Sequence, residues 1–188
     1  HDEEGHDDHD DHGHGALDPH FWLDPIRLAD VADAIAAALT EIDPDGADVY
    51  AQNAAALRAD LEQLDADFQA GLADCASTDL VTGHDAFGYL ALRYGFEALG
   101  IAGLSPDQEP SPAKLAEVAD FVVEHGITTI YYEALVNPAV AEVVAQETGA
   151  TTAVLDPLET LTDSSSGADY LEVMRSNLAT LRSGQNCR

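Results

Sequence analysis

From Asp79 onward, short runs of β-branched and aromatic residues alternate with longer stretches of helical periodicity. The runs that predict strands are LVTG (80–83), ITTIYYE (127–133) and TTAVLD (151–156), with a weaker candidate around 96–101. Helical stretches lie near 86–94, 112–125, 138–148 and 168–182. Because strands that alternate with helices are usually joined by crossover connections, this order predicts an α/β fold with a small, mainly parallel sheet flanked by helices.

Two helical segments precede this region. In residues 25–42, apolar residues recur every three or four positions, and Pro25 suits the first turn of a helix. The turn-forming sequence DPDG at 43–46 ends that segment. The apolar residues of the following segment fall on one face of a second, longer helix: Tyr50, Leu57, Leu61, Leu64, Phe68 and Leu72. We expect this long helical stretch to brace two parts of a larger structure.

The first 15 residues have a composition that cannot form a packed core. They contain five of the eight histidines, seven acidic residues and three glycines, and no apolar residue. We therefore expect a flexible loop. Its histidines are largely neutral at neutral pH and can bind metal ions, while its carboxylates attract cations. The segment is interpreted as a low-affinity metal-binding loop with ligands His6, His9, His12 and His14. An affinity tag is the alternative, although tags are usually uninterrupted histidine runs.

Acidic residues greatly outnumber basic ones. The chain of 188 residues has 36 Asp and Glu against 7 Lys and Arg, for a formal net charge of −29. This balance excludes a nucleic-acid-binding function, because contacts to phosphate need Lys and Arg. The charge attracts cations, and it is also typical of a solvated surface adapted to a salty or extracellular setting.

No apolar run is long enough to span a bilayer. The chain begins with His1 and has no secretory apolar region, which indicates that an N-terminal segment has been removed.

The two cysteines are Cys75 and Cys187. Two free cytosolic thiols are one interpretation. However, Cys75 precedes an apolar strand and Cys187 is the penultimate residue, so a disulfide bond would fix the C-terminus to the rest of the protein. We favour the bond, which would stabilise the fold by roughly 4–5 kcal/mol in the chain-entropy model. A disulfide bond would also place the protein outside the cytoplasm.

Polar residues follow three of the predicted strands. His84 comes directly after LVTG, Glu133 ends ITTIYYE, and Asp156 ends TTAVLD. Each alone has an ordinary explanation, since strand ends are often polar and Asp156 with the proline after it could start a turn. Because ligands bind at the carboxyl ends of parallel strands, their joint occurrence favours a functional site.

A further histidine, His20, lies in the aromatic-flanked sequence DPHFWLDP. Histidines in well-defined surroundings, backed by carboxylates and close to a histidine-rich tract, indicate metal binding. Imidazole nitrogens suit a borderline-soft divalent ion such as Zn²⁺.

Several motifs together resemble the zinc-binding subgroup of the cluster A-I solute-binding proteins, which serve bacterial zinc and manganese ABC importers. These motifs are the His-rich acidic loop, DPHFWLDP, GHDAFGYLALRYG, LSPDQEPSP, TIYYEALVNP and VLDPLETLT. Their order and spacing make the resemblance specific, and it covers nearly the whole chain. Members of this family look like two α/β lobes joined by a long rigid helix, with the metal in the cleft between the lobes.

The resemblance implies a division of the chain and a set of metal ligands. Residues 1–15 would be the His/acid-rich loop, 16–26 the metal-ligand segment, 27–75 the linking helices and 76–188 the C-terminal α/β lobe; the N-terminal lobe is not contained. The implied ligands of Zn²⁺ are His20, His84 and Asp156, joined by a histidine of the missing lobe. Manganese binders of the family tend to carry Glu where this chain has His84, which favours zinc.

The resemblance also suggests supporting roles for Glu109 and Glu133. We expect each to orient a metal-bound histidine or to cap a helix rather than to bind metal. The implied function is that of an extracytoplasmic protein, periplasmic or lipid-anchored at the outer face of the cytoplasmic membrane, which delivers Zn²⁺ to a membrane permease. The alternatives are a manganese- or iron-binding homologue and a metal-dependent surface adhesin. A zinc hydrolase is less favoured, because no HExxH-like pair is present.

Overall fold

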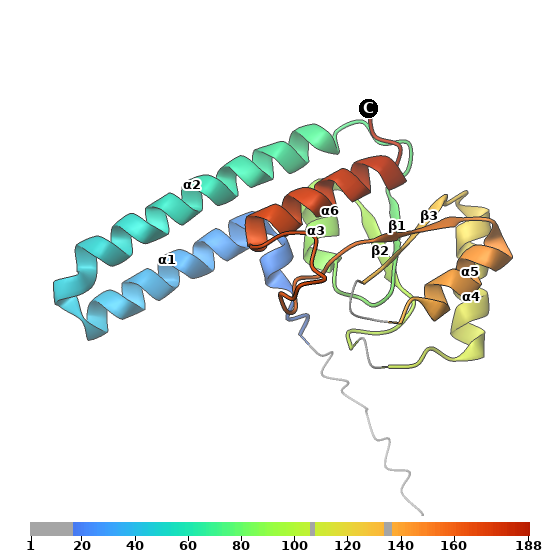
Figure 1. The fold of residues 1–188 in the computed structure, drawn as a ribbon, viewed down its shortest axis with the longest axis horizontal. Coiled ribbons are helices and arrows are strands. Elements are labelled where there is room, and N and C mark those ends of the chain that lie inside the picture. The colour runs from blue at the N-terminus through green and yellow to red at the C-terminus, as the bar shows by residue number, and fades with distance from the viewer. Residues whose placement is uncertain (1–16, 106–107, 134–136) are drawn as a thin grey trace, which may run out of the picture.

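A four-stranded parallel sheet forms the centre of the computed structural model, which describes residues 17–105, 108–133 and 137–188. Its strands are β1 (Asp79–Thr82), β2 (Glu97–Gly100), β3 (Thr129–Tyr132) and β4 (Thr151–Val154). They lie in the order β2-β1-β3-β4 (Figure 1), and every neighbouring pair is parallel. The predicted α/β fold with a small parallel sheet is therefore confirmed. The weaker strand candidate is the edge strand β2.

Helices cover both faces of this sheet. They are α3 (Gly88–Tyr94), α4 (Pro112–Glu124), α5 (Ala139–Thr148) and α6 (Tyr170–Gly184). On one face, Val81 and Ile130 form a core with Val118 of α4 and Val144 of α5. On the opposite face, residues one position away in the same strands pack against α3 and α6: Leu80 and Tyr131 share a core with Leu90 and Met174. The alternation of side chains along each strand thus produces a three-layer arrangement.

The two helices that precede the sheet form an antiparallel hairpin. They are α1 (Pro25–Ile42) and α2 (Ala47–Gly71), connected by the 3₁₀ turn η2 (Pro44–Gly46). Figure 1 shows that this hairpin projects well beyond the sheet. Asp24 caps α1, because its carboxylate accepts the backbone N–H of Ile26 at 3.0 Å, and Pro25 occupies the first helical position. The long helix expected from the sequence is therefore present as α2.

Only one end of the hairpin takes part in the core of the α/β fold. Leu64 and Phe68, near the C-terminal end of α2, are fully buried in the core that contains Leu80. Toward the other end of the hairpin, Ile42 is 82% exposed. The last turns of α2 consequently anchor both helices to the sheet.

A disulfide bond joins Cys75 and Cys187, as we expected from their positions. It connects the segment between α2 and β1 to the C-terminus, across 112 residues of sequence. Two backbone hydrogen bonds flank it: Ala76 N–H donates to Gln185 O at 3.0 Å, and Arg188 N–H donates to Asp74 O at 2.9 Å. The end of α6 is thereby fixed beside the start of the sheet.

The predicted metal-binding loop at residues 1–15, including His6, His9, His12 and His14, lies outside the described residues. Within the described ranges, none of the helices combines the length and the apolar composition needed to cross a membrane.

Candidate metal centre

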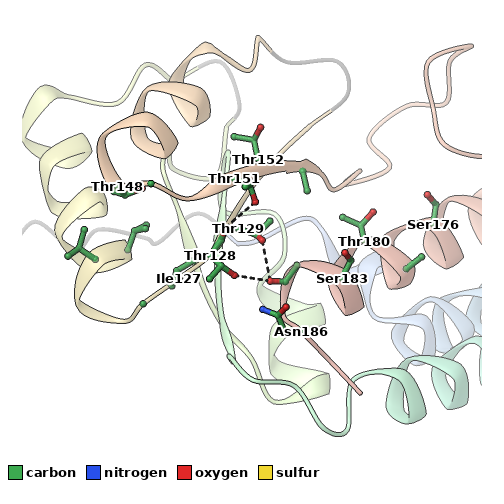
Figure 2. Close-up of a pocket in the computed structure, with 17 residues that line it drawn as sticks. Ile127, Thr128, Thr129, Thr148, Thr151, Thr152, Ser176, Thr180, Ser183 and Asn186 are labelled. Atoms are coloured by element: carbon green, nitrogen blue, oxygen red, sulfur yellow. Dashed lines mark hydrogen bonds between the residues drawn. The ribbon is translucent and has the colours of Figure 1, made fainter.

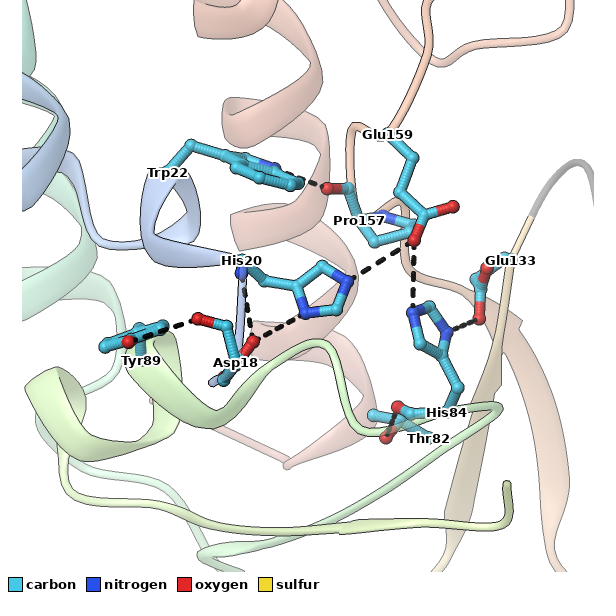
Figure 3. Close-up of polar contacts among 9 residues, drawn as sticks. All are labelled: Asp18, His20, Trp22, Thr82, His84, Tyr89, Glu133, Pro157 and Glu159. Carbon is cyan, nitrogen blue, oxygen red and sulfur yellow. Dashed lines mark hydrogen bonds and ion pairs between the residues drawn. The ribbon is translucent and has the colours of Figure 1, made fainter. Parts of the chain in front are cut away.

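Three side chains from separate segments converge at the carboxyl edge of the sheet. His20 directly precedes the 3₁₀ turn η1 (Phe21–Leu23), His84 follows β1, and Glu159 lies in the loop after β4. One potential ligand atom from each lies within 4.8 Å of the other two. Figure 3 shows both imidazole rings pointing toward the same Glu159 carboxylate oxygen. This oxygen is 3.3 Å from His20 Nε2 and 3.4 Å from His84 Nε2.

His84 is fully buried and held from two sides. Its Nδ1 forms a hydrogen bond with the carboxylate of Glu133, at the end of β3, and Thr82 Oγ1 donates to its backbone carbonyl at 2.8 Å. Gly83 leaves room for this contact, since a Cβ there would lie 3.2 Å from Glu133 Oε1. His84 Nε2, in contrast, is buried and has no hydrogen-bond partner among the described residues. An unsatisfied buried nitrogen is costly, so this atom is poised to bind a ligand.

His20 is held in a corresponding way. It is 2% exposed, and its Nδ1 lies 2.7 Å from Asp18 Oδ1, which also accepts the backbone N–H of His20 at 2.9 Å. Tyr89 Oη donates to the backbone carbonyl of Asp18 at 3.3 Å and ties this segment to α3. Both histidines therefore place Nδ1 against a carboxylate and leave Nε2 facing Glu159. A carboxylate that accepts the second N–H of a metal-bound histidine fixes the tautomer and the orientation of the ring.

The acidic surroundings of His84 also change its proton affinity. Burial lowers the pKa of His84, but the hydrogen bond and negative charge of Glu133, with a contribution from Glu159, outweigh it, so that the pKa is raised above its ordinary value of 6.5. The site thus stabilises positive charge at the imidazole. A metal cation can provide that charge in place of the proton.

The loop that carries Glu159 has a defined shape. Asp156 Oδ1 accepts the backbone N–H of Leu158 at 2.8 Å, and Leu158 adopts a left-handed conformation with φ of 59°. Asn177 of α6 holds the backbone of Asp156 through hydrogen bonds of 2.9 and 2.7 Å to its N–H and C=O. Because an Asp side chain that bonds the backbone two residues ahead stabilises a turn, Asp156 directs the chain so that Glu159 faces the histidines.

The structure brings together some, but not all, of the site residues predicted from the sequence. It brings His20 and His84 together, and it places Glu133 in contact with His84, as a supporting residue would be. Asp156 is buried near the site but is not a member of the three-residue group. Glu109 is exposed and forms no hydrogen bond with the described part of the site; Ser111 rather than Glu109 caps α4.

Sequence reasoning missed Glu159 and Asp18. Glu159 lies three residues after Asp156, in the same post-strand loop, and Asp18 lies two residues before His20. The proximity of each carboxylate to a predicted ligand was the available signal.

A hollow of about 1030 Å³ lies at the opposite edge of the sheet (Figure 2). Thr129 and Thr151, the first residues of β3 and β4, line it together with Ser183 of α6. Its lining contains neither histidine nor carboxylate among the described residues. The hollow is therefore separate from the metal-ligating group.

Comparisons with known proteins find relatives whose names specify zinc. The sequence matches the model of the ZnuA family, described as "Zinc-uptake complex component A periplasmic", over residues 1–184. It is 42% identical over 180 residues to the zinc-binding protein AdcA of Streptococcus pyogenes serotype M1, covering 94% of this chain and 35% of that protein. It is 39% identical over 169 residues to the high-affinity zinc uptake system protein ZnuA of Bacillus subtilis, covering 89% of this chain and 53% of that protein.

The fold is also similar to a solved structure. The laminin-binding protein Lbp of Streptococcus pyogenes superposes with a TM-score of 0.84 at 42% identity, covering 89% of this chain and 65% of that one. The chain thus spans only part of the length of these relatives.

Proposed function

The chain belongs to the ZnuA family of cluster A-I zinc-binding proteins, and we propose that it forms the Zn²⁺-capturing part of the extracytoplasmic component of a zinc ABC importer. In this role Zn²⁺ is the cargo, and a membrane permease is the partner that receives it. The family description names a periplasmic component of an uptake complex, which supports a location outside the cytoplasm. Because the family consists of transport components, the chain is a binding protein rather than an enzyme.

The observation that carries this proposal is the convergence of two oriented imidazoles on one carboxylate. His20 Nε2 and His84 Nε2 both lie within 3.4 Å of Glu159 Oε1, and each ring is fixed from behind by a second carboxylate. Two nitrogen donors with one oxygen donor suit the small coordination shell of Zn²⁺ better than that of Mn²⁺, which prefers oxygen ligands. The names of the AdcA and ZnuA relatives also specify zinc.

We assign the carboxylate ligand to Glu159 rather than to Asp156. The Asp156 carboxylate is engaged with the backbone of its own loop, whereas a Glu159 oxygen faces both histidines. A tetrahedral zinc site takes four ligands. The fourth would come from the histidine that the family resemblance places in an N-terminal lobe, with residues 76–188 forming the C-terminal lobe and residues 27–75 linking the two.

The histidine-rich tract would act as a low-affinity collector of zinc. Its four interior histidines, His6, His9, His12 and His14, alternate with acidic residues that attract cations. It would raise the local zinc concentration near the buried site without forming part of it.

A zinc titration with a competing chelator tests the proposal on the full chain. To silence the tract, its four interior histidines are replaced by alanine. We expect one site per chain, lost in His84→Ala and kept in His125→Ala, because His125 lies at the end of α4 and pairs with Asp79 instead. The absence of a site, or a site that survives His84→Ala, would contradict the proposed function.

The assignment of the carboxylate ligand has its own test. Glu159→Ala removes the oxygen that faces the histidines and is expected to weaken zinc binding at least about tenfold. Asp156→Asn keeps an oxygen that can accept the N–H of Leu158 and should have a much smaller effect. The reverse order of effects would make Asp156 the ligand.

A further inference from the structure

Trp22 connects two of the three segments that build the metal centre. It lies in η1, two residues after His20, and its indole Nε1–H donates a hydrogen bond of 2.8 Å to the carbonyl oxygen of Pro157. Pro157 lies two residues before Glu159 in the loop after β4. Figure 3 shows the indole reaching from the His20 segment to this loop. This hydrogen bond thus joins the His20 segment to the loop that carries Glu159.

Two further contacts hold Trp22 in place. Tyr170, the first residue of α6, donates its hydroxyl to the backbone carbonyl of Trp22 at 2.6 Å. The indole also lies edge-on to the His20 ring, with ring centroids 5.4 Å apart and an interplanar angle of 64°. Trp22 therefore touches one metal-ligating ring directly and holds the loop of the ligating carboxylate through its N–H.

The loop can transmit this restraint to Glu159 because hydrogen bonds hold the residues on both sides of Pro157. The Asp156 carboxylate fixes the N–H of Leu158, and Asn177 fixes the backbone of Asp156. Glu159, by contrast, is 39% exposed, and its oxygen is held by the histidines only through long contacts, of 3.3 Å to His20 Nε2 and 3.4 Å to His84 Nε2. The position of its carboxylate consequently depends on the course of the backbone before it.

We propose that Trp22 is a positioning residue that keeps the His20 segment and the Glu159 loop in register for zinc binding. This inference rests on the proposed function, since it concerns how tightly the same site holds zinc. Trp22 does not contact the ion. Its indole N–H sets the distance between the nitrogen and oxygen ligands, and metal sites whose ligands are held by surrounding hydrogen bonds bind more tightly than loosely held ones.

The test compares zinc affinity by chelator competition in the full chain with the tract histidines replaced. Trp22→Phe keeps an aromatic ring but removes the N–H donor, and we expect a loss of affinity of roughly 3- to 10-fold. Tyr170→Phe removes the support of Trp22 and should give a smaller loss in the same direction. Tyr94→Phe is the matched control, because it removes a hydroxyl hydrogen bond to Asp65 away from the metal centre; its affinity should remain unchanged.

A double-mutant cycle separates positioning from a general loss of structure. If Trp22 acts through Glu159, the effect of Trp22→Phe should disappear in a Glu159→Ala background. The absorption spectrum of bound Co²⁺ should shift in Trp22→Phe but not in Tyr94→Phe, because only the former moves a ligand. Wild-type affinity in Trp22→Phe, or a loss that persists in the Glu159→Ala background, would overturn the inference. A zinc site that survives His84→Ala would instead overturn the proposed function.

Discussion

The Nδ1 atom of His84 is hydrogen-bonded to the carboxylate of Glu133, which directly follows the neighbouring strand β3. The pairing of β1 with β3 therefore brings together the ring that we propose as a zinc ligand and the carboxylate that holds it. Since the ring is fully buried, a bond of this kind determines which nitrogen faces the cation. We therefore expect Glu133 to affect binding although it does not itself face the site.

Replacing Glu133 should weaken zinc binding without removing the site. Glu133→Gln keeps the size of the side chain but removes its negative charge, and we expect a loss of affinity of about 10- to 100-fold. Chelator competition measures this loss. Glu109→Gln is the matched control, because Glu109 is exposed and has no hydrogen bond to the described part of the site. Equal losses in the two variants would contradict a specific role for Glu133.

Zinc affinity should fall with decreasing pH and should begin to fall above pH 6.5. Burial lowers the pKa of His84, but the bond and charge of Glu133 raise it by more, and the net shift is upward from 6.5. Protonated His84 cannot bind zinc. The zinc affinity is therefore highest above this raised pKa and decreases by at least about tenfold per pH unit below it. In Glu133→Gln, the decrease should start at a lower pH. A pH series of zinc titrations on both proteins tests this shift.

The same pKa shift has the opposite consequence for the metal-free fold. Because the folded state holds the His84 proton more tightly, this group contributes stability below pH 6.5, and the contribution is lost as the pH rises through the raised pKa. Zinc binding then restores a positive charge beside Glu133 in the pH range where the proton has left.

The sheet could be predicted from the sequence because its signals are local. Strands β1, β3 and β4 contain β-branched or aromatic residues that are bounded by helical stretches. The edge strand β2 gave a weaker signal, since Glu97 and Ala98 are exposed and the strand lacks an apolar pattern. His84 was predictable for a related reason: it follows a buried strand, and strand ends of a parallel sheet meet at one edge.

The position of Glu159 could not be predicted in this way. It depends on the left-handed conformation of Leu158, a strained choice for a residue that is not glycine, and on Asn177 from a later helix. Asn177 acts through a tertiary contact, and the only local signal for Glu159 is its place three residues after Asp156. Asp156, which the family resemblance implied as the ligand, is the residue that shapes this turn.

The disulfide bond should contribute strongly to stability and little to zinc binding. It closes a loop of 112 residues and lies at the ends of α2 and α6, away from the carboxyl edge of the sheet. A double Cys75→Ala, Cys187→Ala variant should lose up to about 4–5 kcal/mol in free energy of unfolding, measured in urea. The zinc affinity of the folded variant should remain close to that of the wild type. A large loss of affinity in the folded variant would show that the bond shapes the site.

Salt should stabilise the fold, because the chain has a formal net charge of −29. Arg58 illustrates the scarcity of positive charge: it lies 2.7 Å from Asp30 and 2.6 Å from Asp33, so that one guanidinium pairs with more than one carboxylate. Raising the ionic strength from about 0.01 M to 1 M shortens the screening length from about 30 Å to about 3 Å and reduces self-repulsion. The thermal midpoint should rise across this range in sodium chloride. An unchanged or falling midpoint would contradict this prediction.

Long-range ¹H–¹⁵N NMR of the histidine rings reports which ring nitrogens bind zinc. In the chain whose four interior tract histidines are replaced by alanine, we expect one equivalent of Zn²⁺ to shift the Nε2 resonances of His20 and His84, while Nδ1 of both rings stays protonated. His125 should be unaffected. Coordination through Nδ1, or zinc-induced shifts confined to histidines other than His20 and His84, would contradict the proposed zinc site.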